Sequence, residues 1–101
     1  NMPFKIAPLT NNTFAILGKN NNYIEIKISS PDEILNDYNG NALNEFLLFQ
    51  IDLNKEFEKR APSDDFKNIS VIWKKVPESI IKKYKLLLEE LEQKKKTSGL
   101  E

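Results

Sequence analysis

The sequence contains no histidine, no cysteine and only three glycines among its 101 residues. Without cysteine the chain has no disulfide and no thiol nucleophile, and without histidine it lacks the commonest general base and the commonest zinc ligand. No glycine-rich phosphate loop is present either. We therefore expect no enzyme activity, no catalytic residue, no metal site and no cofactor.

The sequence also lacks long apolar runs and an excess of charge. No run approaches the roughly 18 apolar residues of a membrane-spanning helix, and the N-terminus does not show the basic-then-apolar pattern of a signal peptide. Fifteen basic residues balance fifteen acidic ones, so the net charge does not by itself indicate nucleic-acid binding. These absences favour a soluble intracellular protein without membrane association.

What remains is a composition typical of a small globular domain, with 40% hydrophobic and 30% charged residues. The pattern changes near Gly40. Residues 1–40 are expected to form an extension that contains strands and a short helix, and residues 41–97 a helical domain. The expected fold class is α+β, mainly α.

The extension is expected to contain a β-hairpin. Residues 14–17 form a short apolar run, and residues 23–28 alternate so that three isoleucines share one face. Between them, residues 18–22 are rich in glycine and asparagine, which tolerate turn conformations. Two strands alone are only marginally stable, so the isoleucine face needs a packing partner.

A short helix is predicted to follow the hairpin. Ser30 is placed as an N-cap, Pro31 as the first helical residue and Glu33 as the partner in a capping box. The helix is expected to end near Asp37, with a loop over residues 36–41.

Three longer helices are predicted in the second half of the chain. The first spans residues 42–60, with an apolar stripe of Phe46, Phe49, Leu53 and Phe57. The second is expected to be capped within residues 63–65 and to continue to Val76. The third runs from Pro77 to Lys96. Aromatic residues on these helices are expected to pack in one core.

Residues 41–95 resemble an HMG box, particularly the fungal mating-type boxes. Asn44 to Phe49 resembles the segment that opens the first helix of those boxes, and Pro62 follows Phe46 by sixteen residues, as the inter-helix proline of the family does. The pair Ile69-Ser70 resembles the start of the second helix, and the segment from Trp73 to Pro77 resembles the turn into the third. Tyr84 lies eleven residues after Trp73, where the family has an aromatic residue.

The sequence departs from the family at several points. About four residues are missing between the Ile-Ser pair and Trp73, which is close to one helical turn and predicts a shortened second helix. Asn41-Ala42 replaces the usual Arg-Pro, Glu45 replaces an alanine, and Gln50 stands where an arginine is common.

The resemblance implies an L-shaped three-helix domain that binds the minor groove of DNA and bends the duplex. Asn44 would then contact base edges and Leu47 would be the wedge between base steps, with Gln50 beside them. Ser70 would lie near the DNA backbone. The implied phosphate contacts are Lys74 and Lys75, with Lys82 in a basic segment along the groove.

A second interpretation of the first helix stays open at this stage. Leu47, Leu48 and Ile51 lie outside the apolar stripe and could instead dock the isoleucine face of the hairpin. In that case Leu48 and Ile51 are the better docking residues and Leu47 the better wedge.

Charge argues against strong DNA binding. Residues 42–96 carry twelve basic and ten acidic side chains, a net charge of only +2. Glu45 and Asp52 are expected near the groove face, where they would repel phosphate. The leading hypothesis is a nuclear, DNA-bending regulator of transcription or mating type. The alternative is a divergent protein-interaction module, with a partner at the hairpin or at the surface of Leu48 and Ile51.

Overall fold

The N-terminal region of the computed structural model, which describes residues 4–37, 40 and 42–98, is a three-stranded antiparallel sheet. The strands are β1 (Lys5–Thr10), β2 (Thr13–Leu17) and β3 (Tyr23–Lys27), in the order β1-β2-β3. The predicted hairpin is confirmed as β2 and β3. The third strand, β1, was not predicted, so the sheet is larger than a hairpin.

The register places apolar side chains on one face of the sheet. Ile16 pairs with Ile6 on β1 and with Ile24 on β3, and Phe14 pairs with Ile26. Phe14, Ile16, Ile24 and Ile26 are all buried. The other face carries alternate residues such as Leu17, Tyr23 and Glu25, and all three are exposed. This alternation is that of a sheet with one face on the core and one face in water.

The helices follow the sheet in the order α1 (Pro31–Asn36), α2 (Glu45–Lys59), a 3₁₀ turn η1 (Asp64–Phe66), α3 (Ile69–Trp73) and α4 (Glu78–Ser98). The structure is thus α+β and mainly helical, as expected. The capping box that starts α1 is present: the Ser30 and Glu33 side chains each accept a hydrogen bond from the other residue's backbone N–H. Residues 38, 39 and 41 of the predicted loop, and 99–101 at the C-terminus, lie outside the described residues.

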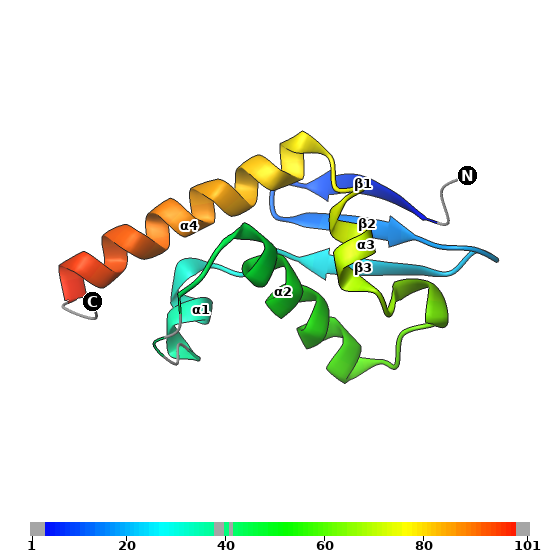
Figure 1. Cartoon of the computed structure of the whole chain (residues 1–101), viewed down its shortest axis with the longest axis horizontal. Coiled ribbons are helices and arrows are strands. Elements are labelled where there is room, and N and C mark those ends of the chain that lie inside the picture. The colour runs from blue at the N-terminus through cyan, green and yellow to red at the C-terminus, as the bar shows by residue number, and fades with distance from the viewer. Residues whose placement is uncertain (1–3, 38–39, 41, 99–101) are drawn as a thin grey trace.

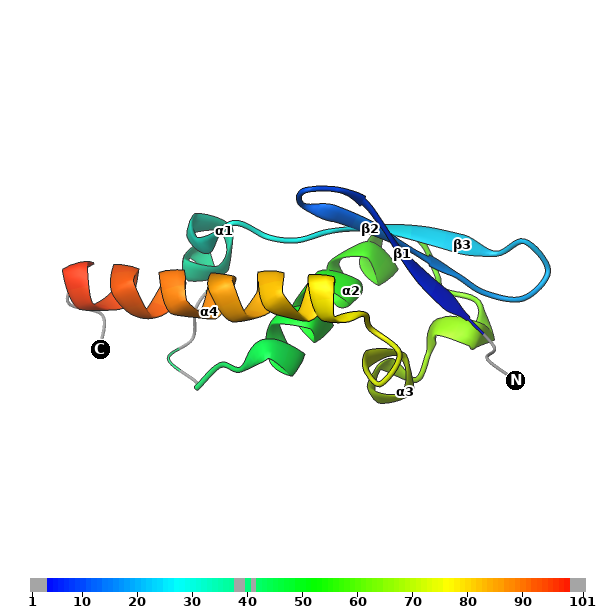
Figure 2. The ribbon, with the colours of Figure 1, turned by 90° about the horizontal axis from the view of Figure 1, so that it is seen from above.

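Helix α2 lies between the sheet and α3 (Figure 2), and α4 runs past α2 and continues beyond the sheet toward α1 (Figure 1). One hydrophobic core joins the two halves of the chain, because buried residues of β2 and β3 cluster with Leu48, Phe49 and Leu53 of α2 and with Tyr84 and Leu91 of α4. The isoleucine face of the hairpin therefore finds its packing partner in the helices.

Aromatic side chains fill the centre of this core. The Phe49 ring stacks on Phe14 at 6.0 Å between centroids, and it lies 5.0 Å from Trp73 and 5.9 Å from Tyr84. Phe46 meets the edge of Trp73 at 6.0 Å. Such tilted and edge-on arrangements are the favoured geometries of aromatic pairs. The expectation that these aromatic residues pack in one core is confirmed.

The predicted second helix is wrong in its extent. In place of one helix from residues 63–65 to Val76, the structure has η1 and the five-residue helix α3. Ser63 makes no side-chain cap, and the Asp65 carboxylate accepts the backbone N–H of Lys19 from the hairpin loop at 2.7 Å. The N-cap of α3 is Asn68, whose side chain accepts the Val71 backbone N–H.

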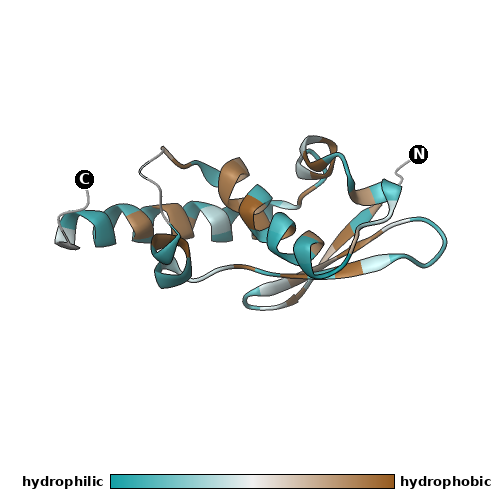
Figure 3. Cartoon of the chain, turned by 90° about the horizontal axis from the view of Figure 1, so that it is seen from below, coloured by the Kyte–Doolittle hydropathy of each residue, from teal (hydrophilic) through white to brown (hydrophobic). Residues whose placement is uncertain are grey.

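Helix α2 starts three residues later than the predicted residue 42, because Asn44 caps it. Its first turns and much of α3 are hydrophobic, whereas its last turns and the C-terminal end of α4 are hydrophilic (Figure 3). Leu48, assigned to the flank of the apolar stripe, is completely buried, so the core face of α2 is wider than the predicted stripe.

Candidate nucleic-acid interface

The N-terminal half of α2 carries three of the predicted contact residues. Asn44 is the N-cap: its side-chain oxygen Oδ1 accepts the backbone N–H of Leu47 at 2.9 Å, and the residue is exposed. Leu47 lies about one helical turn after Asn44 and Gln50 about two, and both are half-buried. Gln50 lines two neighbouring depressions of the surface, one toward α1 and one toward α3.

The depression toward α3, which we call the α2–α3 hollow, brings Gln50 and Ser70 to one surface although they are twenty residues apart. Phe46 and Gln50 line it from α2. The other lining residues come from η1, α3 and their connection: Asp64, Lys67, Asn68, Ile69 and Ser70. Amide, hydroxyl and charged groups thus surround apolar atoms, a mixture that can both hydrogen-bond and pack against a ligand.

The charges in the α2–α3 hollow cancel. The Lys67 ammonium lies 2.9 Å from the Asp64 carboxylate, and its hydrogen bond and charge hold the pKa of Asp64 below the usual value. Both side chains are largely exposed, so this pair adds little to stability. The hollow therefore offers hydrogen bonds and apolar contact rather than a strong positive potential.

The depression toward α1, which we call the α1–α2 groove, has a volume of about 330 Å³. Its apolar lining comes from Ile34, Ala42, Leu43, Leu47 and Ile51, and its polar rim includes Glu33, Asp37 and Lys55. The Ser30 backbone N–H donates to the Glu33 carboxylate and lowers its pKa. Leu47 is therefore one wall of an apolar groove rather than an isolated projecting side chain.

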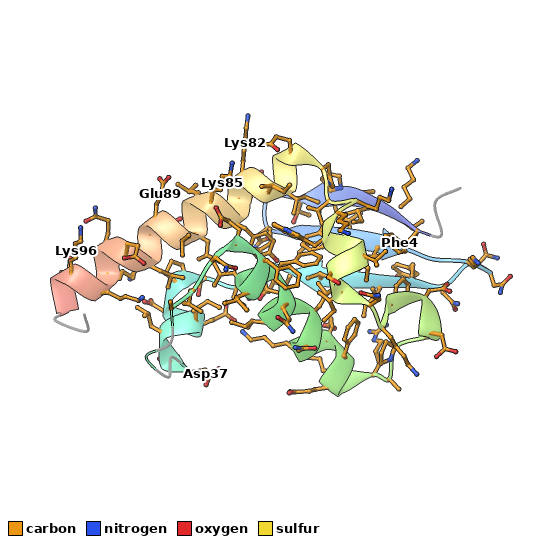
Figure 4. The ribbon with its side chains drawn as sticks, viewed as in Figure 1. Phe4, Asp37, Lys82, Lys85, Glu89 and Lys96 are labelled. Atoms are coloured by element: carbon orange, nitrogen blue, oxygen red, sulfur yellow. The ribbon has the colours of Figure 1, made fainter. Side chains whose placement is uncertain are left out.

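Two of the three predicted phosphate-binding lysines directly follow α3, the helix whose first residues line the α2–α3 hollow. Lys74 and Lys75 are exposed directly after α3, and neither forms an ion pair with any side chain that the structure describes. Lys82 instead projects from the outer edge of α4 together with Lys85, away from α2 (Figure 4). The structure therefore does not bring Lys82 together with Gln50 and Ser70.

The expectation that Asp52 faces the groove of DNA is wrong. Asp52 is only 2% exposed, and it accepts hydrogen bonds from the Ser29 hydroxyl at 2.5 Å, the Ser29 backbone N–H at 3.2 Å and the Tyr84 hydroxyl at 2.7 Å. Lys55 donates to the Ser29 hydroxyl oxygen at 2.8 Å. Asp52 thus ties α2 to the segment after β3 and to α4, and it cannot repel phosphate at the surface.

Burial dominates the ionisation of this buried cluster. Desolvation raises the pKa of Asp52 despite the hydrogen bonds from Ser29 and Tyr84. The pKa of Tyr84 is raised by its own burial and by the Asp52 carboxylate beside it, so its hydroxyl remains a proton donor. Glu45, the other acidic residue expected near DNA, is half-buried in the first turn of α2.

Sequence reasoning missed Asn68, which lines the α2–α3 hollow and caps α3. Its oxygen Oδ1 accepts the Val71 backbone N–H at 3.3 Å and the Ser70 hydroxyl at 2.9 Å. A capping-type residue directly before the Ile-Ser pair was the available signal.

The chain matches no family model, no curated protein and no solved structure. Within the described ranges, no cluster of acidic side chains has the geometry to hold a metal ion. No helix among the described residues is both long and apolar enough to cross a bilayer.

Proposed function

We propose that this protein binds the minor groove of DNA in the manner of an HMG box and bends it, as a nuclear regulator of transcription or mating type. Three helices around an aromatic centre support this proposal, since Phe46, Phe49, Trp73 and Tyr84, which the resemblance assigns to aromatic positions of the box, pack against one another. The shortened second helix agrees with the residues missing before Trp73.

The observation that carries the proposal is the α2–α3 hollow. Gln50 and Ser70, two residues that the resemblance assigns to DNA contact, line the same depression. Asn44 and Leu47 lie on the same helix as Gln50, within two turns of it. Proteins that bind the minor groove combine amide side chains with an apolar wedge, and this surface offers both.

The low positive charge beside the α2–α3 hollow limits the affinity. If Lys74 and Lys75 supply the main phosphate contacts, the slope of log K against log salt should be only about −2. Shape and bending then matter more than charge, so DNA that is already bent should bind better than a straight duplex.

The test is a fluorescence-anisotropy titration with a labelled A·T-rich duplex and a four-way junction at several salt concentrations. We expect salt-sensitive binding with preference for the junction. Replacing Lys74 and Lys75 with Gln should weaken binding and flatten the salt slope. The matched control replaces Lys5 and Lys19, which are exposed on the sheet and its loop, and should leave binding unchanged. Absence of binding at low salt would refute the proposal.

Leu47→Ala tests the wedge directly. Because Leu47 is half-buried, we expect a loss of stability of about 1 kcal/mol, below the range for fully buried leucines. The bend angle, measured by energy transfer between the ends of a labelled duplex, should fall clearly. A stable variant that bends DNA as well as the original protein would remove Leu47 from the role of wedge.

One observation favours a second candidate, a protein-interaction module. Leu47 also lines the α1–α2 groove with Ile34 and Ile51, and such a groove suits the apolar face of a partner's amphipathic helix. Ile51→Glu tests this candidate: a carboxylate in the apolar wall of the α1–α2 groove should abolish partner binding.

A further inference from the structure

The free edge of β3 carries backbone groups that do not pair with β2. The Ile28 N–H donates to the Asn12 carbonyl at the end of the β2–β3 ladder. Hydrogen-bonded pairs alternate along an antiparallel ladder, so Ile24 and Ile26 also bond to β2. The residues between them direct their N–H and C=O groups to the outer edge of the sheet (Figure 1): Tyr23, Glu25 and Lys27.

The opposite edge of the sheet does not offer the same groups. Pro8 of β1 pairs with Phe14, whose backbone bonds to β3, so Pro8 also lies at an outward position. It has no N–H to donate, and the register of β1 shifts directly after it. On β3 the outward residues are exposed, and their backbone groups make no other hydrogen bond within the described part of the chain. A row of such groups can bind an extended segment.

A hollow of about 210 Å³, which we call the β3–α2 slot, lies along this edge. Glu56 and Arg60, from the C-terminal end of α2, line it together with residues of β3. The Glu56 carboxylate lies 3.7 Å from the Lys59 ammonium, whereas Arg60 is exposed and forms no ion pair with any side chain that the structure describes. The slot therefore contains a guanidinium group without a matching anion.

We propose that an extended, acidic peptide segment of a partner protein adds to β3 as a fourth strand. Its backbone pairs with the outward groups of Tyr23, Glu25 and Lys27, and its alternate side chains enter the slot. A carboxylate at one of these positions binds Arg60, because a guanidinium matches a carboxylate with two parallel hydrogen bonds. This binding does not depend on the proposed DNA binding.

A second copy of this chain fits the edge less well than an acidic segment does. If β3 paired with β3 of another copy, the side chains that reached the slot would be the copy's Ile24 and Ile26, because these residues face the helical side of the sheet. Apolar side chains would remove water from Arg60 without supplying an anion, which is unfavourable for a charged group.

The test adds the peptide acetyl-Thr-Val-Lys-Glu-Thr-Val-amide, whose Glu and valines share one side of the strand, to the isotope-labelled protein. In the free protein, NMR should show that the amide protons of Glu25 and Lys27 exchange with solvent at least about tenfold faster than those of Ile24 and Ile26. Saturating peptide should slow the first pair by about tenfold or more and leave the second pair unchanged.

The charge contact is tested by removing either partner. A peptide with Gln in place of Glu, and the variant Arg60→Gln, should each reduce the affinity about tenfold, and the two changes together should reduce it no further. The matched control is Lys5→Gln, which removes the same charge at the exposed start of β1 and should bind the original peptide as before. Equal affinity for the two peptides would overturn the acidic partner.

The backbone pairing is tested by Glu25→Pro, which removes one outward N–H and leaves the ladder with β2 in place, and which should abolish binding. If this variant does not fold, a peptide methylated at all its backbone nitrogens replaces it and should not bind. Absence of protection by the original peptide would overturn the proposal. Protection of Glu25 and Lys27 in the free protein that rises with protein concentration would also overturn it, since a second copy would then occupy the edge.

Discussion

Polar groups on the two sides of α2 differ in burial and in hydrogen bonding. On the side facing the sheet and α4, Asp52 is buried and each of its oxygens accepts hydrogen bonds from Ser29 or Tyr84. On the outer side, Asn44 is exposed and Gln50 is half-buried. A buried polar group without a partner costs about 1–3 kcal/mol, so full pairing on the inner side is a requirement of folding.

On the outer side, some polar groups have no hydrogen-bond partner among the residues that the structure describes. Folding does not require one there, because water can bind these groups. Asn44 and Asn68 use their oxygens to cap helices and keep their NH2 groups toward water. The inner polar groups therefore serve the fold, whereas the outer ones remain available for a ligand. Substitutions on the two sides of α2 can test this distinction.

The largest effect is expected for two adjacent residues of α2, of which one is completely buried and the other is half-buried. Phe49 is completely buried among Phe14, Trp73 and Tyr84, so Phe49→Ala should cost about 3–5 kcal/mol of unfolding free energy. Gln50→Ala, one residue later, should change it by less than about 0.5 kcal/mol. Urea denaturation measures both, and similar losses for the two variants would contradict the distinction.

A smaller effect is expected where the hairpin loop meets η1. A Cβ added at Gly18 would lie 2.6 Å from the Asp65 carboxylate and 3.1 Å from the Phe66 ring. Gly18→Ala should therefore displace Asp65 from the Lys19 N–H and cost about 1–3 kcal/mol. NMR shifts of the Lys19 amide would report the lost bond.

Gly40→Ala is the comparison for this prediction, because nothing lies within 4 Å of an added Cβ there and only the positive φ of 88° opposes it. Its cost should be about 1 kcal/mol. If Gly18→Ala left the Lys19 amide unshifted and cost no more than Gly40→Ala, the close approach of Asp65 to the hairpin loop would not limit the residue at position 18.

Local signals in the sequence sufficed for much of the fold. The Ser30 capping box, the hairpin alternation and the prolines at positions 62 and 77 act within a few residues of the elements they define. Strand β1 was not predicted because Pro8 interrupts the alternation of apolar and polar residues. Proline is tolerated there because β1 is an edge strand.

The errors in the helical half come from distant contacts. Within η1, Asp65 accepts the backbone N–H of Lys19, which is 46 positions away. Asp52 could have been recognised, because it lies three residues after Phe49 on the apolar side of α2, where an acidic residue needs buried partners. Those partners, Ser29 and Tyr84, were not predictable from local pattern.

The candidate site was predictable only through the resemblance. Gln50 and Ser70, both of which that resemblance assigns to DNA contact, line one hollow, whereas Lys82 projects from a different side. Asn68 was missed because only the structure shows that it lines this hollow and that its Oδ1 accepts hydrogen bonds from Ser70 and Val71.

The smallest expected effect is a dependence of the unfolding free energy on pH. It should differ between the buried carboxyl of Asp52 and the more exposed one of Glu33. Burial raises the pKa of Asp52 above 3.8, so the folded state binds a proton more readily than the unfolded state. The stability contributed by this group is complete below 3.8 and is lost as pH rises through the folded-state pKa. Asp52→Asn cannot titrate, so the difference in unfolding free energy between the original protein and this variant should decrease as pH rises through that window.

The stability that Glu33 contributes should change with pH in the opposite direction. Its pKa is lowered below 4.5, chiefly by the Ser30 backbone N–H, so its contribution is present above 4.5 and is lost as pH falls through the folded-state pKa. Solvent screening at this exposed capping box makes the effect small. Urea titrations of both variants at pH values on either side of 4 compare the two signs. If Asp52→Asn followed the same direction as Glu33→Gln, the hydrogen bonds from Ser29 and Tyr84 would outweigh burial, and the inner side of α2 would hold a stabilised anion rather than a costly one.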